Sequence, residues 1–363
     1  GTEQKRYYLI SSQQKSGKTQ LTSFIFIFNN LLYAYYHHGQ VRLKIFYYPL
    51  EETKEDITLR FMSYLLFRFS NHSIRICPDD LRSTNEINPV PKEILDLFDT
   101  PEYKDVLDFF QKTVIFEEST NPTGVWKDLN NYAKEHGTLH YTEVIKKNSA
   151  GIDEKVNKFD YYEPNDPDEY VEIIWDHISL TSLERGMDLR NSISKLSEYF
   201  VALKNRYSYI PIIIQQQSTE TQNLDAFKMN KIRPTPAGLA DNKNTGRDCD
   251  AMLSIINPFA FELPTYLKYR IDKFGDNIRF LEISLNRHGR KNEVLPLYFD
   301  GAVCFYHVLP SSADTKALES VYNYIDQIRK TEKKNIEKAK PSMAMFCHSF
   351  YKKIIDRITN KQK

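Results

Sequence analysis

Residues 10–19 read I-S-S-Q-Q-K-S-G-K-T, and this stretch decides the fold of the chain. An apolar, aromatic run precedes it and indicates a buried strand, while apolar residues at helical spacing follow it from position 21 to position 32. A strand, a tight loop and a helix form the context that a phosphate-binding loop requires. The sequence therefore predicts a site for a nucleoside triphosphate.

The residues of this loop have the chemistry that phosphate groups need. In such loops the backbone N–H groups and the helix N-terminus converge on the phosphates, a lysine adds positive charge, and a hydroxyl reaches Mg²⁺. Lys18 and Thr19 stand at the positions for those two side chains. The pattern G-x-x-x-x-G-K-[ST] expects glycine at the position of Ser12, which the loop accommodates if the φ angle of that serine stays negative. We expect the nucleotide to contact the whole loop: Ser12, Gln13, Gln14, Lys15, Ser16, Gly17, Lys18, Thr19 and Gln20.

Composition and charge exclude several classes of protein. Of the 363 residues, 41% are hydrophobic and 27% are charged, which suits a folded chain with a sizeable core. The formal net charge is +1, so contact with nucleic acid requires local basic patches. The four cysteines lie far apart without a C-x-x-C pair, which argues against zinc and against a disulfide framework. We find no signal peptide and no run of about 20 apolar residues, so we expect a cytoplasmic protein without a membrane span.

Polar side chains follow three more predicted strands. Residues 41–48 form a strand that ends just before Glu51, residues 171–175 form a buried strand that ends in Asp176, and residues 210–214 form a strand followed by three glutamines. Open α/β sheets bind ligands at the carboxyl ends of their strands. Asp176 is therefore a candidate to orient Mg²⁺, and Glu51 to polarise an attacking water. From the residues alone, Glu51 is equally well explained as an acidic residue at a helix start.

Other segments predict helices around the sheet, an insertion and a tail. Residues 54–69 predict a strongly apolar helix. Residues 138–170 predict a hairpin insertion on the surface, which could be an arm that binds a partner or only an elaborated loop. Residues 228–247 are basic and rich in Pro, Asn and Gly, so they predict a long mobile loop that could contact phosphates or simply be solvated. After residue 313 we expect a charged helix and a basic tail.

Taken in order, these motifs resemble the RecA-type motor domain of the DnaB-like replicative helicases. The most specific match is R-P-T-P-A-G-L-A-D-N-K-N-T-G-R-D-C-D at 233–250, which is similar without gaps to that family's R-P-x-x-x-D-L-R-E-S-G-x-I-E-Q-D-A-D. Four shorter segments also resemble family motifs: P-L-E at 49–51 with L-R-F-M at 59–62 resembles S-L-E-M, W-D-H-I-S-L at 175–180 resembles D-Y-L-Q-L, Q-Q-Q-S at 215–218 resembles S-Q-L-S, and N-R-H-G at 286–289 resembles K-x-R-N-G.

The resemblance implies a fold. It predicts an α/β, RecA-like P-loop domain in residues 1–310, with a mostly parallel central sheet flanked by helices. The hairpin insertion at 138–170 and a basic helical C-terminal tail at 311–363 lie outside the resemblance.

The resemblance also implies roles for individual residues. ATP and Mg²⁺ are the expected cofactors, with Thr19 and Asp176 on the metal. Four residues are expected to be catalytic: Lys18, Glu51 as the base that activates water, Gln216 as the γ-phosphate sensor with a one-residue ambiguity, and Arg287 as the arginine finger.

The expected partners follow from the same resemblance. Because an arginine finger reaches a neighbouring subunit's nucleotide, we expect a ring of identical subunits, a hexamer in this family. Single-stranded DNA is the expected substrate track, contacted by Arg185, Arg190, Lys228, Lys231 and Arg233. Other replication proteins are expected partners. The usage of Asn, Lys, Ile and Tyr suggests an AT-rich genome, so we expect the cytoplasm of a bacterium or of a phage-infected host.

Three positions depart from the family pattern and keep rival functions open. Ser12 replaces a loop glycine, Leu285 stands where the family has a lysine that assists the finger, and Gly246 stands where it has a glutamate. The family's amino-terminal helical domain is also missing from the residues at hand. The alternatives are a DNA-packaging ATPase of the terminase type, whose phosphate loop is similar, and a nucleotide-binding structural or regulatory subunit with little turnover.

Overall fold

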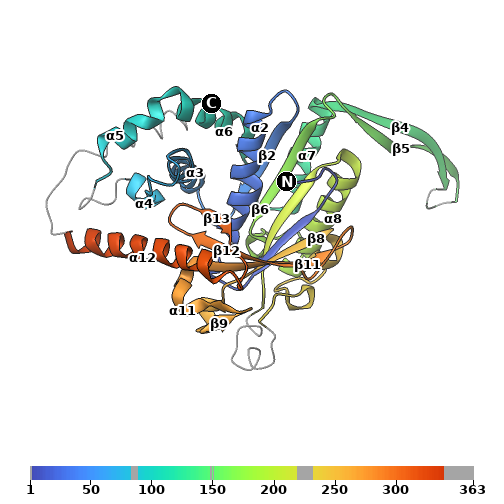
Figure 1. The fold of residues 1–363 in the computed structure, drawn as a ribbon. Coiled ribbons are helices and arrows are strands. Elements are labelled where there is room, and N and C mark those ends of the chain that lie inside the picture. The colour runs from blue at the N-terminus through green and yellow to red at the C-terminus, as the bar shows by residue number, and fades with distance from the viewer. Residues whose placement is uncertain (1, 83–88, 148, 150, 219–231, 339–363) are drawn as a thin grey trace.

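A nine-stranded sheet forms the centre of the molecule (Figure 1). The computed structural model describes residues 2–82, 89–147, 149, 151–218 and 232–338. The strand order is β13-β12-β11-β8-β1-β7-β6-β2-β3. The six strands from β8 to β3 are parallel, and β11, β12 and β13 continue the sheet in antiparallel fashion. This arrangement confirms the predicted α/β class with a mostly parallel central sheet.

The strands follow the predicted apolar runs closely. Three strand pairs were not predicted, namely β9 with β10 and β12 with β13, together with β8 against β11. The bounds are β1 Tyr8–Ser12, β2 Arg42–Pro49, β3 Val114–Phe116, β4 Gly137–Lys147, β5 Asp153–Pro164, β6 Glu169–Asp176, β7 Ile210–Gln216, β8 Ala251–Ile256, β9 Thr265–Tyr266, β10 Tyr269–Arg270, β11 Ile278–Asn286, β12 Val294–Asp300 and β13 Phe305–Val308.

Helices cover both faces of the sheet. The first helical stretch runs from α1 through a π-helical segment, η1, into α2 without a break. The bounds are α1 Lys18–Thr22, η1 Ser23–Asn29, α2 Asn30–Tyr36, α3 Lys54–Phe69, α4 Pro78–Leu81, α5 Lys92–Leu95, α6 Pro101–Thr113, α7 Pro122–Glu135, α8 Leu189–Tyr207, α10 Thr245–Asp248, α11 Ile271–Phe274 and α12 Thr315–Lys338, with 3-10 turns η2 Asp96–Asp99, η3 Ile178–Leu180, η5 Pro236–Gly238, η6 Pro258–Phe261 and η7 Gly275–Asn277.

The alternation of side chains along the strands divides the core into two clusters. In β2, Ile45 and Tyr47 point into the cluster that α3 and α6 cover, whereas Phe46 and Tyr48 point into the cluster that α7 and α8 cover. Successive side chains of a strand lie on opposite faces, so a strand buried on both faces must be apolar throughout. This requirement explains the continuous apolar runs in the sequence.

Two predictions about the outer segments have different outcomes. The predicted helix at 54–69 is confirmed as α3, which begins with a capping box between Thr53 and Asp56. The predicted hairpin is confirmed as β4 and β5, which form their own two-stranded sheet and extend away from the body (Figure 1). Of the expected tail, α12 packs on the core through Leu318 and Ile325, and residues 339–363 lie outside the described residues.

The prediction of a long mobile loop at 228–247 is wrong for the part that the structure describes. Ile232, Leu239 and Thr245 are buried. The side chain of Gln215 donates to the carbonyl oxygens of Ala240 and Asn242, and this amide anchors the loop to β7. A sequence rich in Pro, Asn and Gly indicates the lack of regular structure, but it carries no signal for side-chain amides elsewhere that satisfy the loop's backbone. Within the described residues, no helix is both long and apolar enough to cross a bilayer.

Glu172 is a buried carboxyl in the middle of β6. Its Oε1 accepts hydrogen bonds from the Thr2 hydroxyl at 2.6 Å and from the Asn30 amide at 2.7 Å. Its Oε2 has no hydrogen-bond partner among the described residues. Burial, which disfavours the charged form, raises the pKa of Glu172 to about 8.

We predict that this carboxyl lowers the stability of the protein as the pH rises. Between pH about 4.5 and about 8 the folded state holds the proton more tightly than the unfolded chain, so raising the pH favours unfolding. The free energy of unfolding should fall by up to about 1.4 kcal/mol per pH unit because of this group. Urea unfolding of wild type and Glu172→Gln across this range should show two curves that converge towards pH 8 or cross. Parallel curves would contradict the assignment.

Candidate nucleotide site

The loop between β1 and α1 has the geometry of a phosphate-binding loop. Gly17 has a φ of +92°, a left-handed conformation that favours glycine, and α1 begins at the next residue. Two side chains from distant strands fix the loop from behind. The Tyr306 hydroxyl donates to the Gly17 carbonyl at 3.1 Å, and Arg279 Nε donates to the Ser16 carbonyl at 2.9 Å. Ser12 is the last residue of β1, so the missing glycine falls on extended backbone.

A cavity of about 430 Å³ opens between this loop, the end of β2 and the end of β6. Of the predicted nucleotide-binding residues, six line the cavity, while Ser12, Gln13 and Ser16 do not. Gln13 instead donates its amide to the carbonyl of Ile232 at 2.7 Å. The lining residues are Gln14, Lys15, Gly17, Lys18, Thr19, Gln20, Glu51, Glu52, Arg60, Asp176, His177 and Gln216.

The register of the sheet brings these side chains together. Pro49 of β2 pairs with Asp176 of β6, which places Glu51 near Asp176, and Ser12 of β1 pairs with Gln216 of β7. Parallel strands end at one edge of a sheet, where open α/β folds bind ligands. The predicted convergence of strand ends on the loop is therefore seen in the structure.

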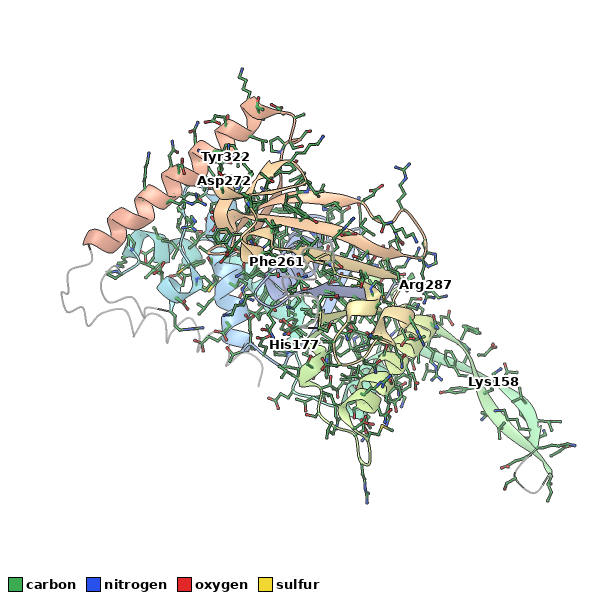
Figure 2. The ribbon with its side chains drawn as sticks, turned by 90° about the horizontal axis from the view of Figure 1, so that it is seen from below. Lys158, His177, Phe261, Asp272, Arg287 and Tyr322 are labelled. Carbon is green, nitrogen blue, oxygen red and sulfur yellow. The ribbon has the colours of Figure 1, made fainter. Side chains whose placement is uncertain are left out.

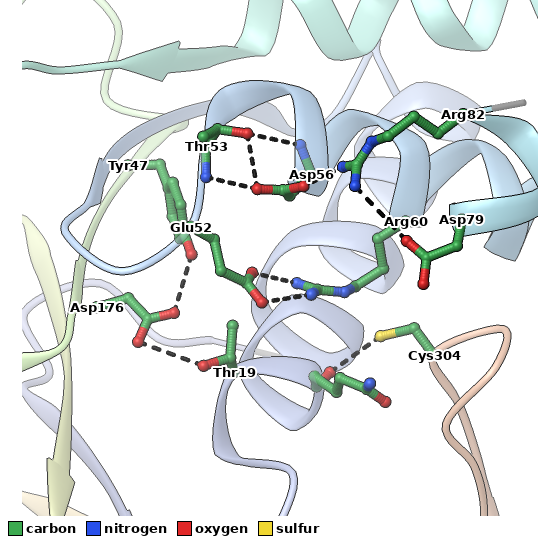
Figure 3. Close-up of polar contacts among 11 residues, drawn as sticks. Thr19, Tyr47, Glu52, Thr53, Asp56, Arg60, Asp79, Arg82, Asp176 and Cys304 are labelled. Atoms are coloured by element: carbon green, nitrogen blue, oxygen red, sulfur yellow. Dashed lines mark hydrogen bonds and ion pairs between the residues drawn. The ribbon is translucent and has the colours of Figure 1, made fainter. Parts of the chain in front are cut away.

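Asp176 lies opposite Thr19 (Figure 3). The Thr19 hydroxyl is 3.4 Å from Asp176 Oδ1, and the Tyr47 hydroxyl donates to Oδ2 at 3.0 Å. Asp176 is 1% exposed, and burial, followed by the nearby Glu52 carboxylate, raises its pKa to about 7. A cation in the cavity would offset this cost of burying a negative charge.

Lys18 is the positive charge of the cavity floor. Its Nζ donates to the Gln13 carbonyl at 3.1 Å, so the ammonium is held at the mouth of the loop. Burial lowers the pKa of Lys18 to about 8, and the carboxylates of Asp176 and Glu51 oppose that shift. An anionic ligand at this position would favour the charged form of the lysine.

Two adjacent acids at the end of β2 have different surroundings. The Glu51 side chain is 56% exposed, and its Oε2 is 3.6 Å from His177 Nε2. Burial lowers the pKa of His177. Glu52 instead forms two hydrogen bonds with Arg60 of α3, at 2.5 and 2.6 Å (Figure 3). Glu51 is therefore the acid that is free to meet a ligand, and Glu52 is already neutralised by Arg60.

Glu52 and Arg60 are cavity residues that the sequence interpretation missed. Arg60 belongs to the quoted L-R-F-M segment, yet it received no role. The available signal was the position of an arginine on the inward face of α3, among residues that are otherwise apolar. A buried guanidinium needs an acidic partner, and Glu52 supplies it.

The three glutamines that follow the strand at 210–214 have separate functions in the fold. Gln215 holds the backbone of residues 240–242, and Gln217 donates to the Ser11 hydroxyl at 2.8 Å. Among the three, only Gln216 lines the cavity. The geometry thus removes the one-residue ambiguity in the sequence prediction.

Arg287 lies on the surface, at the end of β11, and is not among the cavity residues (Figure 2). Its guanidinium donates to the carbonyl oxygen of Arg247, and its backbone N–H donates to the carbonyl of Asp250. The structure therefore does not bring Arg287 to the cavity of its own chain.

The predicted DNA-binding residues have mixed positions. Arg185 and Arg190 are exposed, ahead of and within the start of α8. Arg233 forms two hydrogen bonds with Glu282, at 2.6 and 2.7 Å, so its charge is already paired. Lys228 and Lys231 lie outside the described residues.

Comparison with solved structures finds domains of the same architecture. One of them, a helicase ATPase domain, covers 85% of this chain and 86% of its own length, with 13% sequence identity and a TM-score of 0.54. A DnaB-like replicative helicase, described with its interactions with primase, covers 84% of this chain with 13% identity and a TM-score of 0.54, and this chain spans 57% of that protein. The sequence matches no protein-family model and no curated protein. The chain therefore has the RecA-like fold of these ATPase domains.

Proposed function

We propose that this chain is an ATP-dependent motor that hydrolyses ATP at interfaces between its own copies and moves along single-stranded DNA. The observation that carries the proposal is the meeting of Lys18, Thr19, Asp176 and Glu51 in one cavity at the carboxyl ends of parallel strands. The fold that the chain shares with helicase ATPase domains supports the same function. The exposed Arg287 supports hydrolysis in an oligomer.

The donor set suits a nucleoside triphosphate with Mg²⁺. A hydroxyl and a carboxylate, both hard oxygen ligands, lie 3.4 Å apart across the cavity in Thr19 and Asp176. Bound Mg²⁺ would neutralise negative charge on the phosphates. Tyr47 holds the second oxygen of Asp176, so the carboxylate keeps one oxygen towards the cavity.

The remaining side chains have complementary roles in this proposal. Lys18 binds the phosphates, and Gln216 at the end of β7 senses the terminal phosphate. Glu51, half exposed and beside His177, orients the water. Arg287 comes from the adjacent copy, because in its own chain it lies away from the cavity. Arg185 and Arg190 remain the candidates for contact with DNA among the described residues.

The assembly and setting are part of the same proposal. We infer a ring, a hexamer by analogy with the resembling family, that acts with other replication proteins in the cytoplasm of a bacterium or phage-infected cell. Residues 1–310 would form the motor domain and 311–363 a tail attached to it. The low-turnover nucleotide-binding subunit is the main alternative.

Steady-state ATP turnover, measured with and without single-stranded DNA, tests the proposed function. We expect turnover that depends on Mg²⁺ and rises several-fold with DNA, together with loss of nucleotide binding in Lys18→Ala, because that variant lacks the cavity's central cation. Tight nucleotide binding without turnover, in the presence and absence of DNA, would instead identify a nucleotide-binding subunit. Turnover stimulated only by double-stranded DNA would favour the packaging motor.

A further inference from the structure

The β4–β5 arm is rooted in the body and extends well beyond it (Figure 1). In the described part of the chain, β4 and β5 pair only with each other. At the root, the ring of Tyr162 packs against Tyr207 at the end of α8, with 5.0 Å between centroids. Phe159 also reaches Tyr207, and Arg206 lies over the Phe159 ring at 5.3 Å.

One face of the arm is apolar at the root and stays apolar further out. The register pairs Leu139 with Tyr162 and Tyr141 with Phe159, with one extra residue in β5 between these pairs. Since alternate residues of β4 share a face, Ile145 lies on the same face as Leu139 and Tyr141. Leu139 packs on the core, yet Tyr141 is 55% exposed and Ile145 is 68% exposed.

The outer part of the arm lacks cover from the rest of the described chain. From Tyr141 to Lys147 the ribbon extends by roughly 20 Å at about 3.4 Å per residue. An isolated two-stranded hairpin is at best marginally stable in water, because it buries too little apolar surface. A ribbon of this length with apolar residues on one face therefore needs a second surface to cover that face.

The charges of the arm favour a protein surface over nucleic acid. Its four lysines are outnumbered by its acidic residues, and Glu143 forms an ion pair with Lys155 at 2.6 Å on the apolar face. Binding to a phosphate backbone requires an excess of positive charge. The acidic residues are Glu143, Asp153, Glu154, Asp160 and Glu163, and the lysines are Lys146, Lys147, Lys155 and Lys158.

The arm extends from the side of the molecule that carries Arg287 (Figure 2). Contacts connect the two features through α8. Arg287 donates to Arg247 of α10, and Asp248 of α10 accepts from Ser197 of α8, whose far end carries the root of the arm. In the proposed assembly this side faces the neighbouring copy, because Arg287 must reach that copy's nucleotide.

We propose that the β4–β5 arm is a strap between subunits, whose face with Tyr141 and Ile145 lies on the next copy of this chain. This inference rests on the proposed function, since that function places a second copy on the side with Arg287. It also extends that function by assigning a role to the segment outside the resemblance. The strap would hold two subunits together while the contact between Arg287 and the nucleotide forms and breaks.

The test uses the full chain and two matched double variants. Tyr141→Ser with Ile145→Ser removes the exposed apolar side chains, and Lys146→Ser with Lys158→Ser changes two exposed residues on the opposite face. The mass distribution is measured by analytical ultracentrifugation with ATP and Mg²⁺, alongside ATP turnover, nucleotide binding and affinity for single-stranded DNA. We expect the first variant to assemble at least tenfold more weakly and the second to assemble like wild type, with nucleotide binding unchanged in both.

The outcomes separate the strap from the proposed function. If the first variant assembles as wild type does, the strap is overturned, whether or not the protein hydrolyses ATP. A loss of DNA affinity with unchanged assembly also overturns it and makes the arm a nucleic-acid surface. A wild-type chain that stays monomeric under all conditions overturns it as well. If wild type assembles without ATP turnover and the first variant falls apart, the strap stands while the motor function fails.

Discussion

Replacing Arg287 with alanine is expected to lower ATP turnover by about 10³-fold or more, while nucleotide affinity changes little. The guanidinium lies on the surface and away from its own cavity, so its removal leaves Lys18, Thr19 and Asp176 in place. A cation supplied by a neighbouring subunit acts on charge that develops during phosphoryl transfer, and its loss therefore affects turnover more than binding. Turnover and nucleotide binding are measured on the same assembled protein.

Arg290 provides the matched control for this prediction. It lies in the same turn, its side chain is 90% exposed, and it forms only a 3.6 Å ion pair with Glu293. Arg290→Ala should keep turnover near the wild-type level. Mixing inactive Arg287→Ala with inactive Lys18→Ala should restore part of the activity, because some interfaces then combine an intact cavity with an intact arginine. No recovery on mixing, or an equal loss of binding and turnover, would show that Arg287 serves its own chain.

Replacing Glu51 with glutamine is expected to lower turnover by roughly 10²- to 10⁴-fold, with nucleotide binding retained. Glutamine keeps the shape of the side chain but cannot accept a proton from water. The exposed carboxylate beside His177 is free to meet a water molecule, since no arginine pairs with it in the described structure. Single-turnover hydrolysis at saturating ATP measures this effect without a contribution from binding.

Glu52→Gln is the natural control, because the two acids are adjacent and line the same cavity. This substitution removes the charge that pairs with Arg60 and lies near Asp176. A freed guanidinium would attract phosphate, so binding should tighten while turnover falls by less than about tenfold. A larger loss of turnover in Glu52→Gln than in Glu51→Gln would reverse the assignment of the two acids.

Local patterns were sufficient to predict the layers of the fold. The apolar runs that became β1, β6, β7 and β8 are buried on both faces, and such runs indicate strands without any tertiary information. The helix α3 has its cap and its periodicity written into the chain. The two-residue strands β9 and β10 were missed, because two residues contain no period to detect.

Contacts between distant segments limited what could be predicted about the site. Lys18, Thr19 and Asp176 follow recognisable motifs, so their meeting in one cavity was expected. Arg279 was not expected behind the loop. A strand pattern does not reveal that a buried arginine donates to the carbonyl of Ser16, since this bond depends on how β11 lies against the loop. Pairing across the sheet decides such roles.

The buried guanidinium of Arg279 also has a dynamic consequence. It fixes the loop that surrounds a subunit's own ligand, and eight residues further along β11, about 27 Å away at 3.4 Å per residue, lies the arginine proposed to serve the next subunit. A movement of that loop on filling or emptying would be transmitted along one stiff strand towards the adjoining cavity. Turnover should therefore depend sigmoidally on ATP concentration, and Arg279→Met should bring the Hill coefficient close to one.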